Sequence, residues 1–205
     1  MSSHASTAAE TLIIVFARPA IPGRAKTRLI PRLGAWRAAR LHARLTERTL
    51  RVARAARCGA VELKIRQRGK DLGERMFNSF RKALRRHRRV VLIGTDCPVL
   101  QPTDLRRAAR LLCGACDAVL APAEDGGYAL IALKKVRGEL FEGIEWGTDG
   151  VLRESLTKIK SLGWRCRLLR TVWDLDRPED LDRLQPWRAV RSLRFSSDPR
   201  RAARR

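Results

Sequence analysis

One apolar stretch near the N-terminus, Leu12-Ile-Ile-Val-Phe-Ala17, decides the fold class of this chain. It is a continuous run of β-branched and aromatic residues that ends before Pro19, a pattern typical of a strand buried on both faces of a sheet. Residues 18–28 are expected to form a loop, because Pro22 and Gly23 oppose a helix. The run therefore predicts a central strand of a parallel sheet, with a loop at its carboxyl end.

Outward from this strand, apolar runs alternate with segments of helical periodicity. Strands that alternate with helices favour an α/β domain with a mostly parallel sheet and helices on both faces. Ligands of such sheets bind beyond the carboxyl ends of the strands, so a site is expected in the loops that follow them. We expect further strands at 61–65, 90–93, 117–121, 128–133 and 165–169, and helices at 35–57, at 71–87, from 102, at 149–162 and at 177–184.

The length and composition fit one domain. The chain has 205 residues and is 44% hydrophobic, which is enough for a buried core. We place the domain at residues 11–185, between an N-terminal segment, 1–10, expected to be disordered and a basic tail, 186–205, expected to be mobile. The longest apolar run is far below the ~20 residues that cross a bilayer, and residues 1–11 lack the basic region of a signal peptide. A cytoplasmic protein without a membrane span is expected.

The net charge of +23, from 44 basic and 21 acidic residues, raises the question of nucleic-acid binding. However, one Tyr and five Phe leave few side chains on which bases could stack. Nucleic acid is therefore expected to bind non-specifically, if at all. The five cysteines are an odd number and suggest reduced thiols. We interpret Cys113 and Cys116 as two buried small residues at a helix end rather than as half of a metal site.

Basic residues gather in the loop after the first strand. Arg18, Arg24, Lys26 and Arg28 crowd on a backbone constrained by proline and glycine. Cationic side chains and backbone N–H groups could face one anion there, so the loop is a candidate phosphate site. The alternative is an ordinary basic turn in a very basic protein.

Aspartates follow other predicted strands. Asp96 comes directly after a buried strand and is constrained by Pro98, so its carboxylate is expected to project over the end of the sheet. Mg²⁺ typically takes one or two protein carboxylates together with substrate phosphates. Asp176 could supply the second carboxylate, or it could equally cap the helix that follows. Asp125 stands beside two glycines, which either make a tight turn or let a ligand approach the backbone closely.

Six motifs occur along the chain in a fixed order: Phe16-Ala-Arg-Pro with Pro22-Gly-Arg-Ala-Lys-Thr-Arg-Leu29, Asp71-Leu-Gly-Glu-Arg-Met76, Gly94-Thr-Asp-Cys-Pro98, Glu124-Asp-Gly-Gly-Tyr128, Trp146-Gly-Thr148 and Asp174-Leu-Asp-Arg-Pro-Glu-Asp-Leu181. In these motifs the chain resembles the radical-SAM/selenodomain-associated transferases, also called arsenosugar-biosynthesis-type glycosyltransferases. That family is similar to the GT-A nucleotide-diphospho-sugar transferase superfamily. The resemblance implies a single α/β domain of GT-A-like (Rossmann-like) fold, with three layers and a mostly parallel central sheet.

The resemblance also implies a site. A nucleotide sugar donor and a small-molecule acceptor would bind with Mg²⁺ or Mn²⁺, which Asp96 and Asp176 would hold. Asp125 is the candidate catalytic residue, with Glu124 and Asp149 as the other possible bases. The residues expected to bind phosphate or nucleotide are Arg18, Pro22, Gly23, Lys26, Thr27 and Arg28, and those expected to line the sugar or acceptor side are Gly126, Gly127, Tyr128, Trp146 and Thr148.

The sequence is compatible with three alternative functions. The first is a glycosyltransferase-like enzyme that moves a sugar from a nucleotide-diphosphate donor to a small acceptor. The second is a nucleotidyltransferase that moves a guanylyl or cytidylyl group to a phosphorylated acceptor, because the same basic loop would serve a triphosphate. The third is a catalytically impaired nucleotide-binding module, since residues 60–70 form a shorter stretch than the family has there. The sequence does not determine the donor, the acceptor or the oligomeric state.

Overall fold

Strand β1 (Thr11–Phe16) lies inside the sheet, as its apolar sequence predicts. In the computed structural model, which describes residues 10–184, every residue of this strand is buried. Successive side chains of a strand point to opposite faces, so Ile13 belongs to one apolar core and Ile14 to the other. Both faces of the sheet are therefore covered, and the molecule has three layers.

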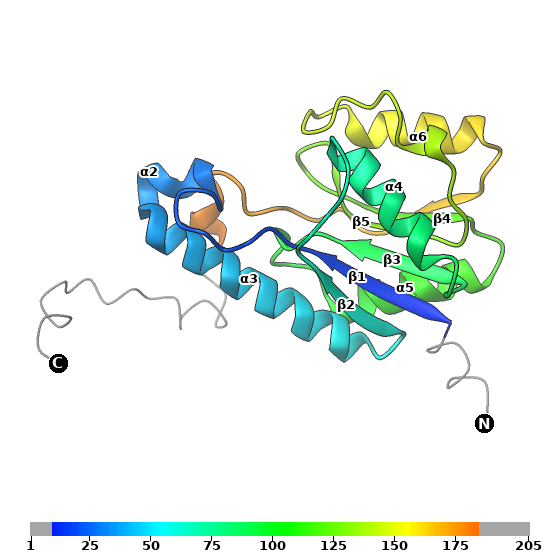
Figure 1. Cartoon of the computed structure of the whole chain (residues 1–205), viewed down its shortest axis with the longest axis horizontal. Helices are drawn as coiled ribbons and strands as arrows, with labels where there is room; N and C mark the ends of the chain where they lie inside the picture. Colours follow the sequence, from blue (N-terminus) through cyan, green and yellow to red (C-terminus); the bar gives the residue numbers. More distant parts are fainter. Residues whose placement is uncertain (1–9, 185–205) are drawn as a thin grey trace, which may run out of the picture.

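The sheet has six strands in the order β2-β1-β3-β5-β4-β6 (Figure 1). Neighbouring strands are parallel except β5, which is antiparallel to both β3 and β4, so the expectation of a mostly parallel sheet is confirmed. The link between β4 and β5 spans only residues 123–127, too few for the crossover that a parallel pair needs. The other strands are β2 (Ala60–Lys64), β3 (Arg89–Ile93), β4 (Ala118–Pro122), β5 (Tyr128–Leu133) and β6 (Cys166–Leu168).

Two helices cover each face of the sheet (Figure 1). Buried residues of α3 (Ala35–Ala56) and α5 (Pro102–Cys113) pack in the core that contains Ile13. Buried residues of α4 (Leu72–Ala83) and α6 (Val151–Ser161) pack in the core that contains Ile14. This arrangement leaves the edge of the sheet at the carboxyl ends of the parallel strands available for a site.

Short helical turns differ from the sequence-based expectation. The end of the predicted loop is a 3₁₀ turn, η1 (Thr27–Leu29), and it continues into the single turn α2 (Ile30–Leu33), which the sequence analysis did not predict. Buried Leu29 anchors this corner against α3. The helix expected at 177–184 is the 3₁₀ segment η3 (Pro178–Leu184), and a further 3₁₀ turn, η2, spans Gly138–Leu140.

The structure bears on the expectations about the ends of the chain, a membrane span and the cysteine pair. The expected tail at 186–205 lies outside the described residues, as does the expected N-terminal segment except Glu10, which pairs with Arg89 at 2.8 Å. No helix within residues 10–184 combines the length and apolar character needed to cross a membrane. Cys113 is the last residue of α5 and is exposed, whereas Cys116, beyond the helix end, is buried, so only one of this pair is a buried small residue.

Candidate functional site

The segment after β6 runs between two of the loops that the sequence singled out. The Val172 N–H donates to the Pro122 carbonyl at 2.9 Å, which continues the pairing beside β4. Three residues later, the Leu175 N–H donates to the Asp96 carbonyl at 2.8 Å, which ties the segment to the loop after β3. These backbone bonds fix Asp174 and Asp176 beside Asp96, although almost 80 residues separate them in the sequence.

Four aspartates, Asp96, Asp125, Asp174 and Asp176, lie close together at the carboxyl ends of the parallel strands. Burial, together with the charges of Asp96 and Asp125, raises the pKa of Asp174 to about 7. Asp176 acts in the same direction, whereas Lys26 opposes the shift. The Oδ1 atom of Asp174 is buried and has no hydrogen-bond partner. A buried carboxylate oxygen without a partner is costly, so the cluster is short of positive charge.

The basic loop supplies the cations of this cluster. Lys26 Nζ lies 2.9 Å from Asp96 Oδ1 and 3.9 Å from Asp176 Oδ1. The contact with Asp96 is an ion pair rather than an aligned hydrogen bond, because Asp96 Oδ1 has no partner of hydrogen-bonding geometry. Lys26 Nζ also donates to the Leu175 carbonyl, and the Arg28 guanidinium donates to Asp176 Oδ2. Two of the predicted phosphate-binding cations, Lys26 and Arg28, therefore lie in one cluster with the two predicted metal-binding aspartates.

The loop backbone explains how Lys26 reaches the aspartates. The turn at Pro22 and Gly23 has left-handed φ at the glycine (+79°), and the Ala25 N–H returns to the Ile21 carbonyl at 3.1 Å. Lys26 itself has φ of +51°, a conformation that is uncommon for residues other than glycine. Its side chain is only 3% exposed, whereas Arg28 is 66% exposed. The Lys26 side chain therefore points into the site, and the Arg28 side chain lies at its solvent-exposed rim.

Two residues of the site were missed by the sequence analysis. Asp174 belongs to one of the quoted motifs, but the strand exit alone did not distinguish it from Asp176. His42, on α3, is buried; its Nε2 lies 2.9 Å from the Arg18 carbonyl and its Nδ1 lies 4.0 Å from Asp96 Oδ1. A histidine on the apolar face of a helix is more often a core residue, so the sequence carried no signal that His42 faces this site.

Asp125 occupies the turn between β4 and β5. Its Oδ1 accepts a hydrogen bond from the Gly127 N–H at 2.9 Å, which orients the carboxylate. Gly126 has φ of +86°, and a Cβ there would lie 2.1 Å from the Asp149 carbonyl oxygen. The Leu152 N–H also donates to the Gly126 carbonyl at 2.9 Å. Close contact with the start of α6 therefore requires this glycine.

The other possible bases differ from Asp125 in their surroundings. Glu124 forms two hydrogen bonds with the Arg183 guanidinium, at 2.8 and 3.0 Å. The hydrogen bonds to Arg183 lower the pKa of Glu124, which makes it a weaker base. The Asp149 backbone is the surface against which Gly126 packs.

The remaining predicted substrate residues lie mostly in packing positions. The Tyr128 hydroxyl is buried, and burial raises its pKa. The Trp146 indole lies so close to Gly73 that a Cβ there would be 2.6 Å from its Nε1. The Thr148 hydroxyl donates to the Glu145 carbonyl at 2.9 Å. Substrate contacts of Tyr128, Trp146 and Thr148 stay predictions.

The oxygen atoms of the aspartate cluster are suitable ligands for a divalent cation. Carboxylate and carbonyl oxygens are the ligands that Mg²⁺ and Mn²⁺ prefer, and the partnerless Asp174 Oδ1 is such an oxygen. Within residues 10–184, no three His, Cys, Asp or Glu side chains are already arranged around one point as metal ligands. Lys26 Nζ instead lies between Asp96 and Asp176. The residues fit a metal by type, while the space between two of them holds an ammonium group.

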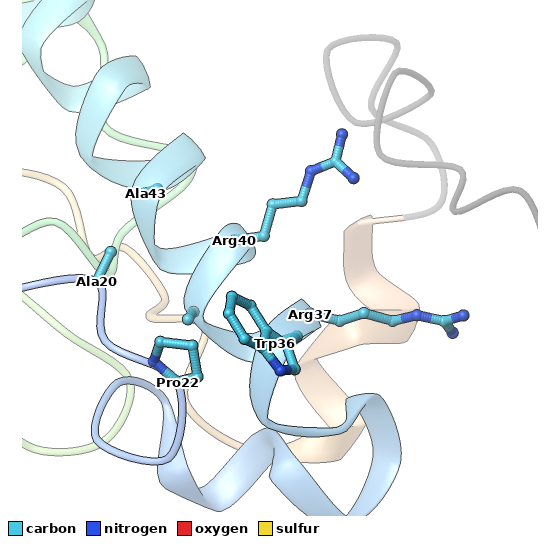
Figure 2. Close-up of a pocket in the computed structure, with 7 residues that line it drawn as sticks. Ala20, Pro22, Trp36, Arg37, Arg40 and Ala43 are labelled. Atoms are coloured by element: carbon cyan, nitrogen blue, oxygen red, sulfur yellow. The ribbon is translucent and has the colours of Figure 1, made fainter. Parts of the chain in front are cut away.

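A cavity of about 610 Å³ lies between the loop's constrained turn and the first turns of α3 (Figure 2). Pro22 and Trp36 line it together with Arg37 and Arg40, and Trp36 is 80% exposed. None of the four aspartates lines this cavity. The cavity shares the loop with the carboxylate cluster but is separate from it.

The comparisons with known proteins agree with this fold. The sequence profile of a bacterial family, described as "Uncharacterized protein conserved in bacteria (DUF2064)", matches residues 34–148. A solved structure from Desulfovibrio desulfuricans G20, provisionally described as a nucleotide-diphospho-sugar transferase, is similar with a TM-score of 0.77 and 28% identity, over 92% of this chain and 90% of that one. No curated protein matches the chain.

A second solved structure shares the fold at lower identity. A nucleotidyl transferase from Methanothermobacter thermautotrophicus is similar with a TM-score of 0.52 and 14% identity, over 89% of this chain and 99% of that one. At this identity the likeness concerns the fold alone. The α/β domain with its mixed, mostly parallel sheet is therefore of the kind found in sugar and nucleotidyl transferases.

Proposed function

The chain belongs to the DUF2064 family, and we propose that it is a metal-dependent transferase that moves a sugar from a nucleoside diphosphate to a small acceptor. The observation that carries the proposal is the convergence of Lys26 and Arg28 with Asp96 and Asp176 at the carboxyl ends of the strands. The likeness to the Desulfovibrio protein supports the sugar-transferase class. So does the sequence resemblance to the arsenosugar-type glycosyltransferases.

The acidic and the basic residues of the site would have different roles in such a transfer. Asp96, Asp174 and Asp176 would hold Mg²⁺ or Mn²⁺, which would neutralise the charge that develops on the diphosphate. Lys26 and Arg28 would bind the phosphate oxygens directly, through charge-assisted hydrogen bonds. Both cations already lie at the aspartates, so the donor phosphates and the metal would share one small region.

Asp125 is the base in this proposal. The acceptor oxygen forms a bond to the anomeric carbon, the bond from that carbon to the phosphate oxygen breaks, and the nucleoside diphosphate leaves with the electron pair. The acceptor proton passes to the Asp125 carboxylate, which the Gly127 N–H holds in one orientation. Glu124 is less suited to this role, since Arg183 engages both of its oxygens.

The test is to incubate the full chain and Mn²⁺ with nucleotide sugars, and in parallel with nucleoside triphosphates and phosphorylated acceptors. We expect release of the nucleoside diphosphate from one class of nucleotide sugar, dependent on Mn²⁺. Release of pyrophosphate from a triphosphate would instead assign nucleotidyl transfer. Tight binding of nucleotides with no turnover of either kind would identify a binding module.

Replacement of Arg28 by alanine should weaken binding of nucleoside diphosphates by about tenfold, because one charge-assisted contact to phosphate is lost. Binding of the nucleoside alone should not change, since the guanidinium lies at the phosphate end of the proposed site. Calorimetric titration of both ligands checks this. Arg107→Ala, which removes an exposed arginine from α5, is the matched control. If R28A binds a nucleoside diphosphate as the wild type does, the loop is an ordinary basic turn.

A further inference from the structure

Building on the proposed function, we propose that the Lys26 ammonium group is an internal counter-cation that occupies the metal position of the site and must leave it before a divalent cation binds. In the ligand-free protein it would stabilise the aspartate cluster. In the loaded enzyme it would move to the phosphates of the donor. Metal and lysine would thus be alternative occupants of one place.

The contacts of Lys26 are those of a bound cation. Its Nζ has three oxygen neighbours, which are Asp96 Oδ1 at 2.9 Å, Asp176 Oδ1 at 3.9 Å and the Leu175 carbonyl. They come from the loop after β3 and from the segment after β6, so only the folded chain assembles them. Oxygens of these two types also form Mg²⁺ and Mn²⁺ sites.

The burial of Lys26 distinguishes it from a surface ion pair. Its side chain is 3% exposed, while those of its partners Asp96 and Asp176 are 46% and 40% exposed. Burying an ammonium group is unfavourable unless it is paired, so the aspartates hold it in place. Arg28 touches the same Asp176 but is 66% exposed, as expected of a group at the rim.

An ammonium group and a divalent cation cannot share these oxygens, because two like charges a few ångströms apart repel strongly. Lysine has four side-chain methylene groups, so Nζ can leave while the backbone stays fixed between the turn at Gly23 and the buried Leu29. Phosphates of a donor would give Nζ a new anionic partner nearby. Donor binding would then open the aspartates to the metal, which is a coupling between the two ligands.

The experiment measures Mn²⁺ binding in the absence of nucleotide, by calorimetry and by the electron paramagnetic resonance signal of free Mn²⁺. Lys26→Met should bind Mn²⁺ at least about tenfold more tightly than the wild type, a size typical of coupled sites. Mn²⁺ should also raise the melting temperature of K26M more than that of the wild type. Lys82→Met, at an exposed lysine of α4, removes the same charge elsewhere and should behave like the wild type.

A second comparison separates occupancy from simple electrostatics. Arg28→Met also removes a positive charge in contact with Asp176, but this charge lies at the exposed rim. We expect a smaller gain in Mn²⁺ affinity for R28M than for K26M. Equal gains, or a K26M affinity no higher than that of the wild type, would overturn the proposal, as would the absence of Mn²⁺ binding in both proteins.

Failure of this inference and failure of the proposed function are distinguishable. A wild type that turns over nucleotide sugars, together with K26M that gains no Mn²⁺ affinity, would overturn only the role of Lys26. A tenfold gain in K26M, in a protein that binds no nucleotide sugar or diphosphate, would support the metal position and overturn the transferase.

Discussion

Asp96→Asn is expected to lower the affinity for a nucleotide sugar in the presence of Mn²⁺ by about 100-fold, as is typical when one partner of a buried or half-buried charge pair is removed. The amide cannot supply the negative oxygen that a divalent cation or Lys26 requires. The fold should be retained, because the Asp96 backbone carbonyl, which accepts the Leu175 N–H at 2.8 Å, is unchanged. Calorimetric titrations with and without Mn²⁺ measure the effect.

Asp182→Asn is the matched control for D96N. Asp182 pairs with Arg32 at 2.6 Å and its side chain is 59% exposed, outside the carboxylate cluster. The same chemical change there should leave ligand binding at the wild-type level. Equal Mn²⁺-dependent affinity in D96N and wild type would remove Asp96 from the site.

Gly126→Ala should destabilise the domain by about 2 kcal/mol or more, since it combines left-handed strain with a backbone clash. The residue has φ of +86°, and the new Cβ would lie 2.1 Å from the Asp149 carbonyl oxygen. For a chain of this size, that loss lowers the melting temperature by about 4–8 °C. Chemical denaturation followed by circular dichroism gives the free energy of unfolding.

The neighbouring glycine is the control for this prediction. Gly127 lies outside the left-handed region. The atom nearest to a Cβ added there would be Asp125 Oδ1, at 3.2 Å, which is the end of a side chain. Gly127→Ala should therefore cost much less than Gly126→Ala. Similar losses in the two variants would show that the contact between Gly126 and α6 does not determine the stability of the turn.

The sequence by itself determined the strands, the long helices and the edge of the sheet at which the site lies. The apolar run Leu12 to Ala17 predicted a strand buried on both faces, and such burial requires helices on two sides. The carboxyl end of this strand then placed the basic loop, and the same rule placed Asp96 and Asp125. These inferences depend on local periodicity and on a general property of parallel sheets, which is why they hold without coordinates.

Only the tertiary structure decided which charged groups meet. Hydrogen bonds donated by the Val172 and Leu175 N–H groups bring Asp174 to the site edge. The burial of His42 beside Asp96 and the position of Lys26 between two carboxylates depend on contacts between distant segments. The strength of a charge interaction depends on the distance between the groups in space, so the partners are determined by packing and not by spacing along the chain.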